Sequence, residues 1–91
     1  MKQTRKRYAI VYDVAIDSER TKIMNLLKQY GTHVQRSVFE AELTDHQRER
    51  LIAKLKPLLD EGTDSLIFYP LGGDPIRVTG GKKPDGGDLV L

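Results

Sequence analysis

The sequence predicts an α+β fold with elements in the order βαββαβ and one short extra strand near the C-terminus. Two separate segments have apolar residues at helical spacing, which indicates two amphipathic helices. Apolar or alternating segments rich in strand-forming residues lie before, between and after those helices.

The first strand is expected at residues 7–13, because the apolar run Tyr-Ala-Ile-Val-Tyr is typical of a central strand covered on at least one face. After three turn residues, Asp17 or Ser18 is expected to cap a helix by accepting from its first backbone N–H groups. Gly31 is expected to end that helix by supplying a left-handed backbone. The buried stripe of the helix follows the i, i+3, i+4, i+7 spacing and comprises Ile23, Leu26, Leu27 and Tyr30.

Residues 33–42 are expected to be extended. Ten residues exceed a typical strand, which leaves two short strands or one bent strand with a bulge near Arg36 and Ser37. The second helix is expected to begin at Thr44, since Thr44 and Gln47 fit a capping box. Its buried stripe comprises Leu51, Ile52, Leu55, Leu58 and Leu59.

Pro57 lies within that stripe and removes a helical hydrogen bond, so the last turn is expected to kink or loosen before Gly62 ends the helix. Residues 65–69 are expected to form the fourth strand. We therefore assign residues 1–71 to one domain and residues 72–91 to a C-terminal strand and tail. The segment 76–79 is short and β-prone and must join a sheet edge. The sheet of its own chain and that of a partner subunit are both acceptors, and the small size of the chain favours the partner's.

Composition narrows the class of protein. The 91 residues contain no cysteine, which excludes disulfides and thiolate zinc sites. No stretch approaches about 18 consecutive apolar residues, and the basic N-terminal segment lacks the apolar region of a signal peptide. We expect a soluble cytoplasmic protein without a membrane partner. The net charge is only +2, and the four cations among the first seven residues can contact phosphates or form a solvated face.

Asp13 is the first candidate functional residue. It ends the first strand, where the chain leaves the core, and Tyr12 and Arg20 lie nearby in the sequence. A carboxylate in this place can bind a divalent cation, with Arg20 contacting a phosphate. A lone aspartate after a strand is more often a turn or capping residue, so the pattern alone leaves both interpretations open.

Several motifs lie at characteristic distances along about residues 7–79. The most specific is Val-Gln-x-Ser-Val-Phe-Glu at the observed distance after Tyr12-Asp13, and the others are Asp17-x-x-Arg20, the Tyr30-Gly31 pair, Leu43-Thr44 and Asp64-Ser-Leu-x-x-Tyr-Pro-Leu71. Together they resemble the CRISPR-associated Cas-two family of small spacer-acquisition proteins. The resemblance implies a ferredoxin-like sandwich that forms a homodimer.

The resemblance also implies a function. Asp13 of each subunit would face the other across the dimer axis as a catalytic residue and Mg²⁺ ligand of an endonuclease acting on RNA or double-stranded DNA. Tyr12, Ser37 and Phe39, together with Arg20, would line the site or the interface. The dimer would also bind DNA and bridge two dimers of the CRISPR integrase subunit in a heterohexameric complex.

Three positions depart from the family pattern. His33 stands where several relatives carry arginine, Arg36 replaces a common aromatic residue, and Lys22 occupies a place where a second helix-start cation often occurs. We expect Arg20, Lys22 and Arg36 to contact nucleic acid, and His33 to line the site or pack in its strand. Two roles stay open, a metal-dependent phosphodiesterase and a DNA-binding adaptor. The alternative to both is a dimeric ribonuclease toxin of the virulence-associated D type.

Overall fold

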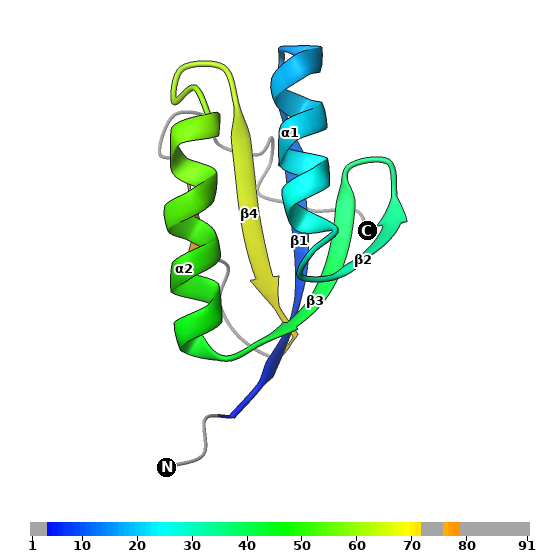
Figure 1. The fold of residues 1–91 in the computed structure, drawn as a ribbon, viewed down its shortest axis with the longest axis vertical. Coiled ribbons are helices and arrows are strands. Elements are labelled where there is room, and N and C mark those ends of the chain that lie inside the picture. Colours follow the sequence, from blue (N-terminus) through cyan, green and yellow to red (C-terminus); the bar gives the residue numbers. More distant parts are fainter. Residues whose placement is uncertain (1–3, 72–75, 79–91) are drawn as a thin grey trace.

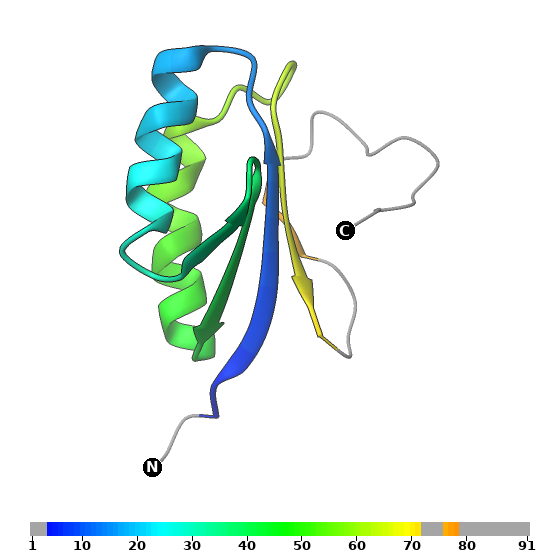
Figure 2. The same ribbon diagram turned by 90° about the vertical axis from the view of Figure 1, so that its right-hand side faces the viewer.

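One antiparallel sheet and two helices form the part of the chain described by the computed structural model, residues 4–71 and 76–78. Both helices cover the same face of the sheet (Figures 1 and 2). The strand order is β2-β3-β1-β4-β5, which confirms the ferredoxin-like βαββαβ sandwich with an extra C-terminal strand. No helix in this part of the chain is long and apolar enough to span a membrane. The elements are β1 (Lys6–Asp13), α1 (Asp17–Leu27), β2 (Thr32–Gln35), β3 (Val38–Leu43), α2 (Asp45–Leu55), the 3₁₀ turn η1 (Lys56–Leu58), β4 (Ser65–Pro70) and β5 (Ile76–Arg77).

β1 is the central strand, as the sequence predicts, because it pairs with β3 along one edge and β4 along the other. Its side chains alternate between the two faces of the sheet. Tyr8, Ile10 and Tyr12 belong to the core beneath the helices. The helices contribute Ile23, Leu27, Leu51 and Leu55 to the same core, all at most 1% exposed.

The other face of the sheet, here called the open face, is covered by neither helix (Figure 2). Val11 lies on this face and pairs in register with Val38 on one side and Ile67 on the other. These three residues form an apolar row across three strands. Two positions further along β1, Asp13 pairs in register with Ser65. The candidate carboxylate therefore lies directly beyond an apolar row.

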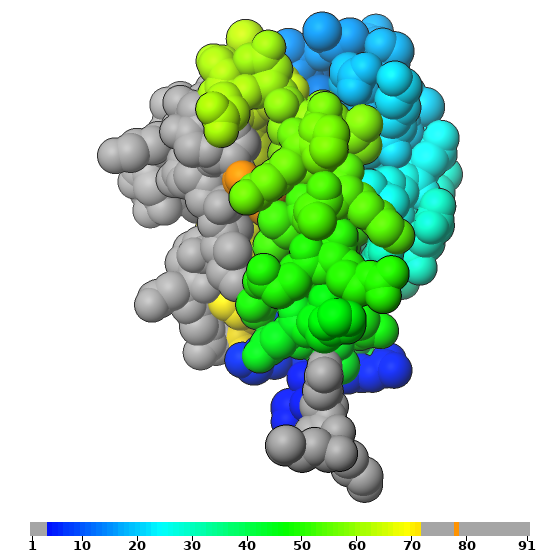
Figure 3. Space-filling model, turned by 60° about the vertical axis from the view of Figure 1, so that its left-hand side comes forward, coloured from blue at the N-terminus to red at the C-terminus, as the bar shows by residue number. Residues whose placement is uncertain are grey.

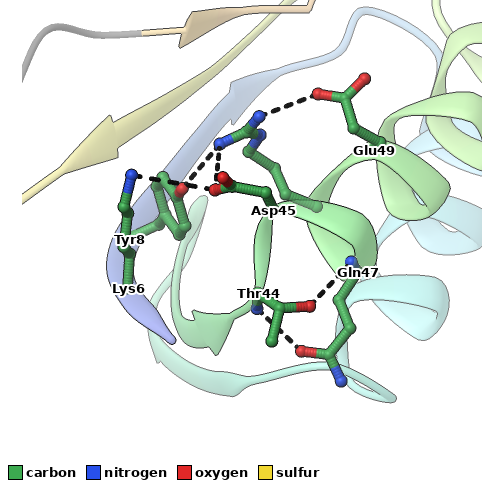
Figure 4. A network of polar contacts seen from close by, with 7 residues as sticks. Lys6, Tyr8, Thr44, Asp45, Gln47 and Glu49 are labelled. Atoms are coloured by element: carbon green, nitrogen blue, oxygen red, sulfur yellow. Dashed lines mark hydrogen bonds and ion pairs between the residues drawn. The ribbon is translucent and has the colours of Figure 1, made fainter. Parts of the chain in front are cut away.

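The two helices begin differently. At α2 the predicted capping box is confirmed: the Gln47 backbone N–H donates to Thr44 Oγ1 at 3.1 Å, and the Thr44 N–H donates to Gln47 Oε1 at 2.9 Å (Figure 4). At α1 the predicted cap is wrong, since the N-cap is Ile16 and makes no side-chain capping bond. Asp17 is instead the first helical residue, and its carboxylate forms a 2.7 Å ion pair with Arg20. A negative charge there still favours the helix through its dipole.

Both helices end earlier than the glycines suggest. α1 ends at Leu27 and a turn continues to Gly31, whose backbone is not left-handed. Glycine is required there for another reason, because a Cβ would overlap the backbone carbonyl oxygen of Glu40. α2 ends at Leu55, and Pro57 lies within η1, which confirms that the last turn loosens at the proline.

Residues 33–42 form two short strands, β2 and β3, one of the two expected arrangements. Arg36 and Ser37 make the turn between them. The pairing register shifts between His33 and Gln35, so the irregularity lies within β2 and not at the turn.

β5 pairs with β4 of the same chain, where Ile76 lies opposite Phe68 and Arg77 opposite Ile67. The backbone N–H of Val78 then donates to Leu66 O at 3.0 Å. The sequence analysis favoured the sheet of a partner subunit for this strand. An exchange of β5 between subunits stays a prediction, since the structure contains one chain, and residues 72–75 and 79–91 of the predicted tail lie outside the described residues.

Gly31→Ala tests the close approach between the α1–β2 turn and β3. We expect a loss of about 2 kcal/mol in the free energy of unfolding, since the added methyl group meets a backbone carbonyl that cannot rotate away. Gly62→Ala is the matched control, because a Cβ there would meet the end of the Asp60 side chain at 3.3 Å. Urea unfolding of the three proteins measures the difference. Equal stability of the two variants would contradict the steric explanation.

Candidate functional site

Asp13 is the last residue of β1, and its side chain is exposed. It lies on the open face, in register with the half-buried Ser65 on β4. A ligand or a second subunit approaching this face can therefore reach the carboxylate. This position agrees with the expectation that a carboxylate stands where the chain leaves the core.

The loop after Asp13 is fixed by Arg20 from the first turn of α1. Arg20 Nε and Nη2 donate to the carbonyl oxygen of Val14 at 3.3 and 3.2 Å, and Nη2 also pairs with Asp17. The Arg20 side chain remains 44% exposed, so it can still meet a phosphate. The structure thus gives Arg20 a local structural role that sequence reasoning did not anticipate.

Tyr12 and His33 converge on one backbone carbonyl. The Tyr12 hydroxyl donates to Arg36 O at 3.3 Å, and His33 Nε2 lies 3.1 Å from the same oxygen. Burial raises the pKa of Tyr12, and the positive charge of Arg20 lowers it by a smaller amount. The phenol therefore stays protonated at neutral pH and can donate. Both side chains help to fix the turn that carries Arg36.

Phe39 and Tyr12 are buried in the core, at 0% and 2% exposure. The Phe39 ring stacks on His33, with centroids 4.6 Å apart and planes inclined by 14°. The Tyr12 backbone N–H donates to Ser37 O at 3.0 Å, which places the half-buried Ser37 beside the end of β1. In the single chain Tyr12 and Phe39 therefore pack in the core and Ser37 holds the end of β1 through its backbone. Contact of these residues with a ligand or a second subunit stays a prediction.

The three predicted nucleic-acid contacts lie on two segments. Arg20 lies in the first turn of α1, and the exposed Arg36 lies on the β2–β3 turn. Both segments adjoin the end of β1 through the hydrogen bonds described above. Lys22 lies further along α1, where its ammonium group pairs with Glu19 at 3.2 Å. Two of the three cationic residues therefore lie on segments that contact the end of β1.

No group of three or more metal-binding side chains occurs within the described ranges 4–71 and 76–78. Asp13 can nevertheless serve as one ligand of Mg²⁺, because this ion commonly uses one or two carboxylates and completes its shell with water and phosphate oxygens. A single chain thus fits one part of a magnesium site. The remaining ligands would have to come from a second subunit, water or the substrate.

A hollow of about 460 Å³ lies elsewhere, at the sheet edge where β2 begins. Its charged lining residues are Arg5, Arg7, Glu40 and Glu42. Arg7 and Glu42 form an ion pair at 3.5 Å. Equal numbers of acidic and basic groups do not favour a phosphate, so this hollow is not the candidate site.

A second polar network lies at the other end of β1 (Figure 4). Arg48 Nη1 donates to the Tyr8 hydroxyl at 3.0 Å and to Asp45 at 3.2 Å, while Nη2 pairs with Glu49 at 2.9 Å. These contacts attach the first turn of α2 to the start of β1. The network is structural and contains no group directed at Asp13.

Asp64 is the important residue that sequence reasoning did not single out. It is only 4% exposed, and its carboxylate accepts from Ala15 N at 3.0 Å, Asp60 N at 2.8 Å and Thr63 Oγ1 at 3.3 Å. Burial raises the pKa of Asp64, but the N–H groups of Asp60 and Ala15 and the Thr63 hydroxyl outweigh that effect and lower it below its ordinary value. Asp64 therefore joins the loop before β4 to the loop after Asp13. These two loops lie side by side at one end of the molecule (Figure 3).

Fold and site together define a small ferredoxin-like protein with an accessible carboxylate at the end of its central strand. The family model described as CRISPR associated protein Cas2 matches residues 6–77. The chain belongs to this family.

Members of the family are similar to this chain in both sequence and structure. The chain is 45% identical over 82 residues to the CRISPR-associated endonuclease Cas2 2 of Thermus thermophilus, covering 89% of this chain and 90% of that protein. It is 40% identical over 77 residues to the CRISPR-associated endoribonuclease Cas2 of Pyrococcus furiosus, covering 82% and 89%. The crystal structure of Streptococcus pyogenes Cas2 at pH 6.5 superposes with a TM-score of 0.68 at 32% identity, covering 72% of this chain and 86% of that one.

The depressed pKa of Asp64 makes stability depend on pH. The stabilisation by its charged form is complete above the ordinary carboxyl pKa of about 4 and is lost as the pH falls through the lower folded-state pKa. We expect Asp64→Asn to be less stable than the wild type by about 2 kcal/mol at pH 7, and this difference to shrink toward pH 3.

Urea unfolding at several pH values measures this difference. Asp60→Asn is the control, because Asp60 lies on the same turn and its carboxylate accepts from Gly62 N and not from the β1–α1 loop. A difference for Asp64→Asn that stays constant down to pH 3 would show that the charged carboxylate is not what stabilises the fold.

Proposed function

We propose that this chain acts in CRISPR adaptation, in the cytoplasm, as a homodimer that binds DNA and bridges two dimers of the integrase subunit. Membership of the Cas2 family supports this role over that of a virulence-associated ribonuclease toxin. The observation that carries the proposal is the apolar row on the open face, formed by Val38, Val11 and Ile67 beside Asp13.

A second copy packed on the open face would bury this row. Val11 and Val38 are only half-buried in the single chain, so part of their apolar surface is still to be removed from water. Because Asp13 lies directly beyond the row, packing about a twofold axis would bring the two Asp13 carboxylates toward each other. At about 4 Å they would repel by about 4 kcal/mol at an effective dielectric constant near 20.

A bound cation removes that repulsion, which favours a second activity for the same dimer, a Mg²⁺-dependent endonuclease. The Asp13 carboxylates would hold Mg²⁺, whose charge would supply activation of a water and stabilisation of the phosphoryl group. Asp13 would hold the ion, while Arg20 and Arg36, on segments that adjoin the end of β1, would contact phosphates of the substrate. The relatives are named endonuclease and endoribonuclease, so double-stranded DNA and RNA are both candidate substrates.

Asp13→Asn tests the nuclease. Asparagine keeps the size of the side chain and removes the charge that holds the metal, so we expect cleavage of labelled RNA or duplex DNA to fall at least a hundredfold. Each protein is assayed with Mg²⁺ and with EDTA, after elution volume has shown that both form the same dimer. If the variant cuts as fast as the wild type, Asp13 is not the catalytic residue.

Two truncations and Asp13→Ala test the adaptor. Removal of residues 76–91 takes away β5, and removal of residues 79–91 keeps it. We expect the longer deletion to abolish co-purification with the integrase subunit, and Asp13→Ala to leave both co-purification and spacer acquisition intact. Loss of acquisition in Asp13→Ala would instead assign the biological role to the metal site. The shorter deletion tells whether β5 or the following residues bind the partner.

A further inference from the structure

Asp64 is a buried carboxylate to which the proposed chemistry assigns no role. It is held by three donors from two separate segments of the chain. Asp60 and Thr63 belong to the turn before β4, whereas Ala15 belongs to the loop after β1. The bond to Ala15 joins residues that are 49 positions apart in the sequence.

The location of this bond relates Asp64 to Asp13. Asp64 directly precedes Ser65, the register partner of Asp13 on β4, and the pairing of β1 with β4 ends at these two residues. Beyond that pair the backbone of β1 has no ladder bond to β4. The hydrogen bond from Ala15 N to Asp64 Oδ1 continues the connection between the two segments, at 3.0 Å.

We propose that Asp64 is a positioning residue for Asp13, holding the loop after β1 against the turn before β4 so that the Asp13 carboxylate keeps a fixed direction on the open face. The inference rests on the proposed function, in which Asp13 binds a divalent cation. Metal sites depend on such supporting groups, because a ligand that changes direction loses affinity for the ion.

The chemistry of the side chain explains why a carboxylate stands here. Oδ1 accepts from Ala15 of the loop after β1 and from the Thr63 hydroxyl, and Oδ2 accepts from Asp60. An asparagine has one acceptor oxygen and would place an NH₂ group against one of these donors. Asp64→Asn is therefore expected to free one of the two segments. The Arg20 bonds to Val14 O would remain and keep the loop folded.

The experiment measures metal binding on the full-length protein with Mn²⁺, which broadens nearby amide signals in NMR spectra. In the wild type we expect broadening centred on Asp13. In Asp64→Asn the Mn²⁺ concentration for half-maximal broadening should rise about tenfold, a typical effect of removing a group that orients a metal ligand. Hydrogen exchange at the Ala15 amide should also become faster. Asp60→Asn removes a carboxylate from the same turn and should leave both quantities unchanged.

The outcomes separate this inference from the function on which it rests. If Asp13→Asn abolishes broadening while Asp64→Asn binds Mn²⁺ like the wild type, the positioning role is wrong and the metal site stands. If Asp13→Asn broadens like the wild type, or if the wild type shows no broadening, the metal site itself is wrong and the inference fails with it. Should Asp64→Asn not fold, Ala15→Pro removes the same hydrogen bond, since proline has no backbone N–H; it also fixes φ at residue 15.

Discussion

The pairing of β1 with a strand on each side is the constraint on which the rest of this structure depends. It fixes the alternation of β1, so that Tyr8, Ile10 and Tyr12 face the helices while Val11 and Asp13 face the opposite way. A shift of the register by one residue would exchange these two sets and bury a carboxylate under the helices. The place of Asp13 on the open face is thus a consequence of the core.

Support for the end of β1 comes from two directions. On one side, Tyr12 and His33 hold the carbonyl of Arg36, which fixes the β2–β3 turn. On the other, Asp64 holds the backbone of Ala15. The His33 ring stacks on Phe39, which is fully buried. The contact of His33 with the β2–β3 turn is therefore fixed to the core. A rigid scaffold around one exposed carboxylate is what a precise ligand site requires.

The sequence predicted features that depend on neighbours along the chain. The capping box of Thr44 and Gln47 lies within four residues, and Pro57 acts on its own turn, so both could be read directly. Asp17 failed as a cap because Arg20 offers it a charged partner within the first turn, which residue preferences do not include. Gly31 was expected for its backbone freedom but is required by the approach of Glu40 from another strand. Asp64 was named only as part of a motif, and its role could not be predicted for the same reason, since its donor Ala15 is distant in sequence.

A metal site with one carboxylate from each chain would couple metal binding to dimer formation. Within the described residues no group of three or more His, Cys, Asp or Glu side chains occurs, so a single subunit offers the ion an incomplete site of low affinity. A second subunit would double the ligands and add the repulsion that an ion relieves, which makes metal binding and dimer formation mutually favourable. The reverse also holds: a dimer without metal would keep that repulsion unless one carboxyl group took up a proton or the two loops moved apart. Asp64 holds the loop after β1 in place and therefore opposes movement of the two loops apart. Its hydrogen bonds would in this way make cation binding by the dimer more favourable.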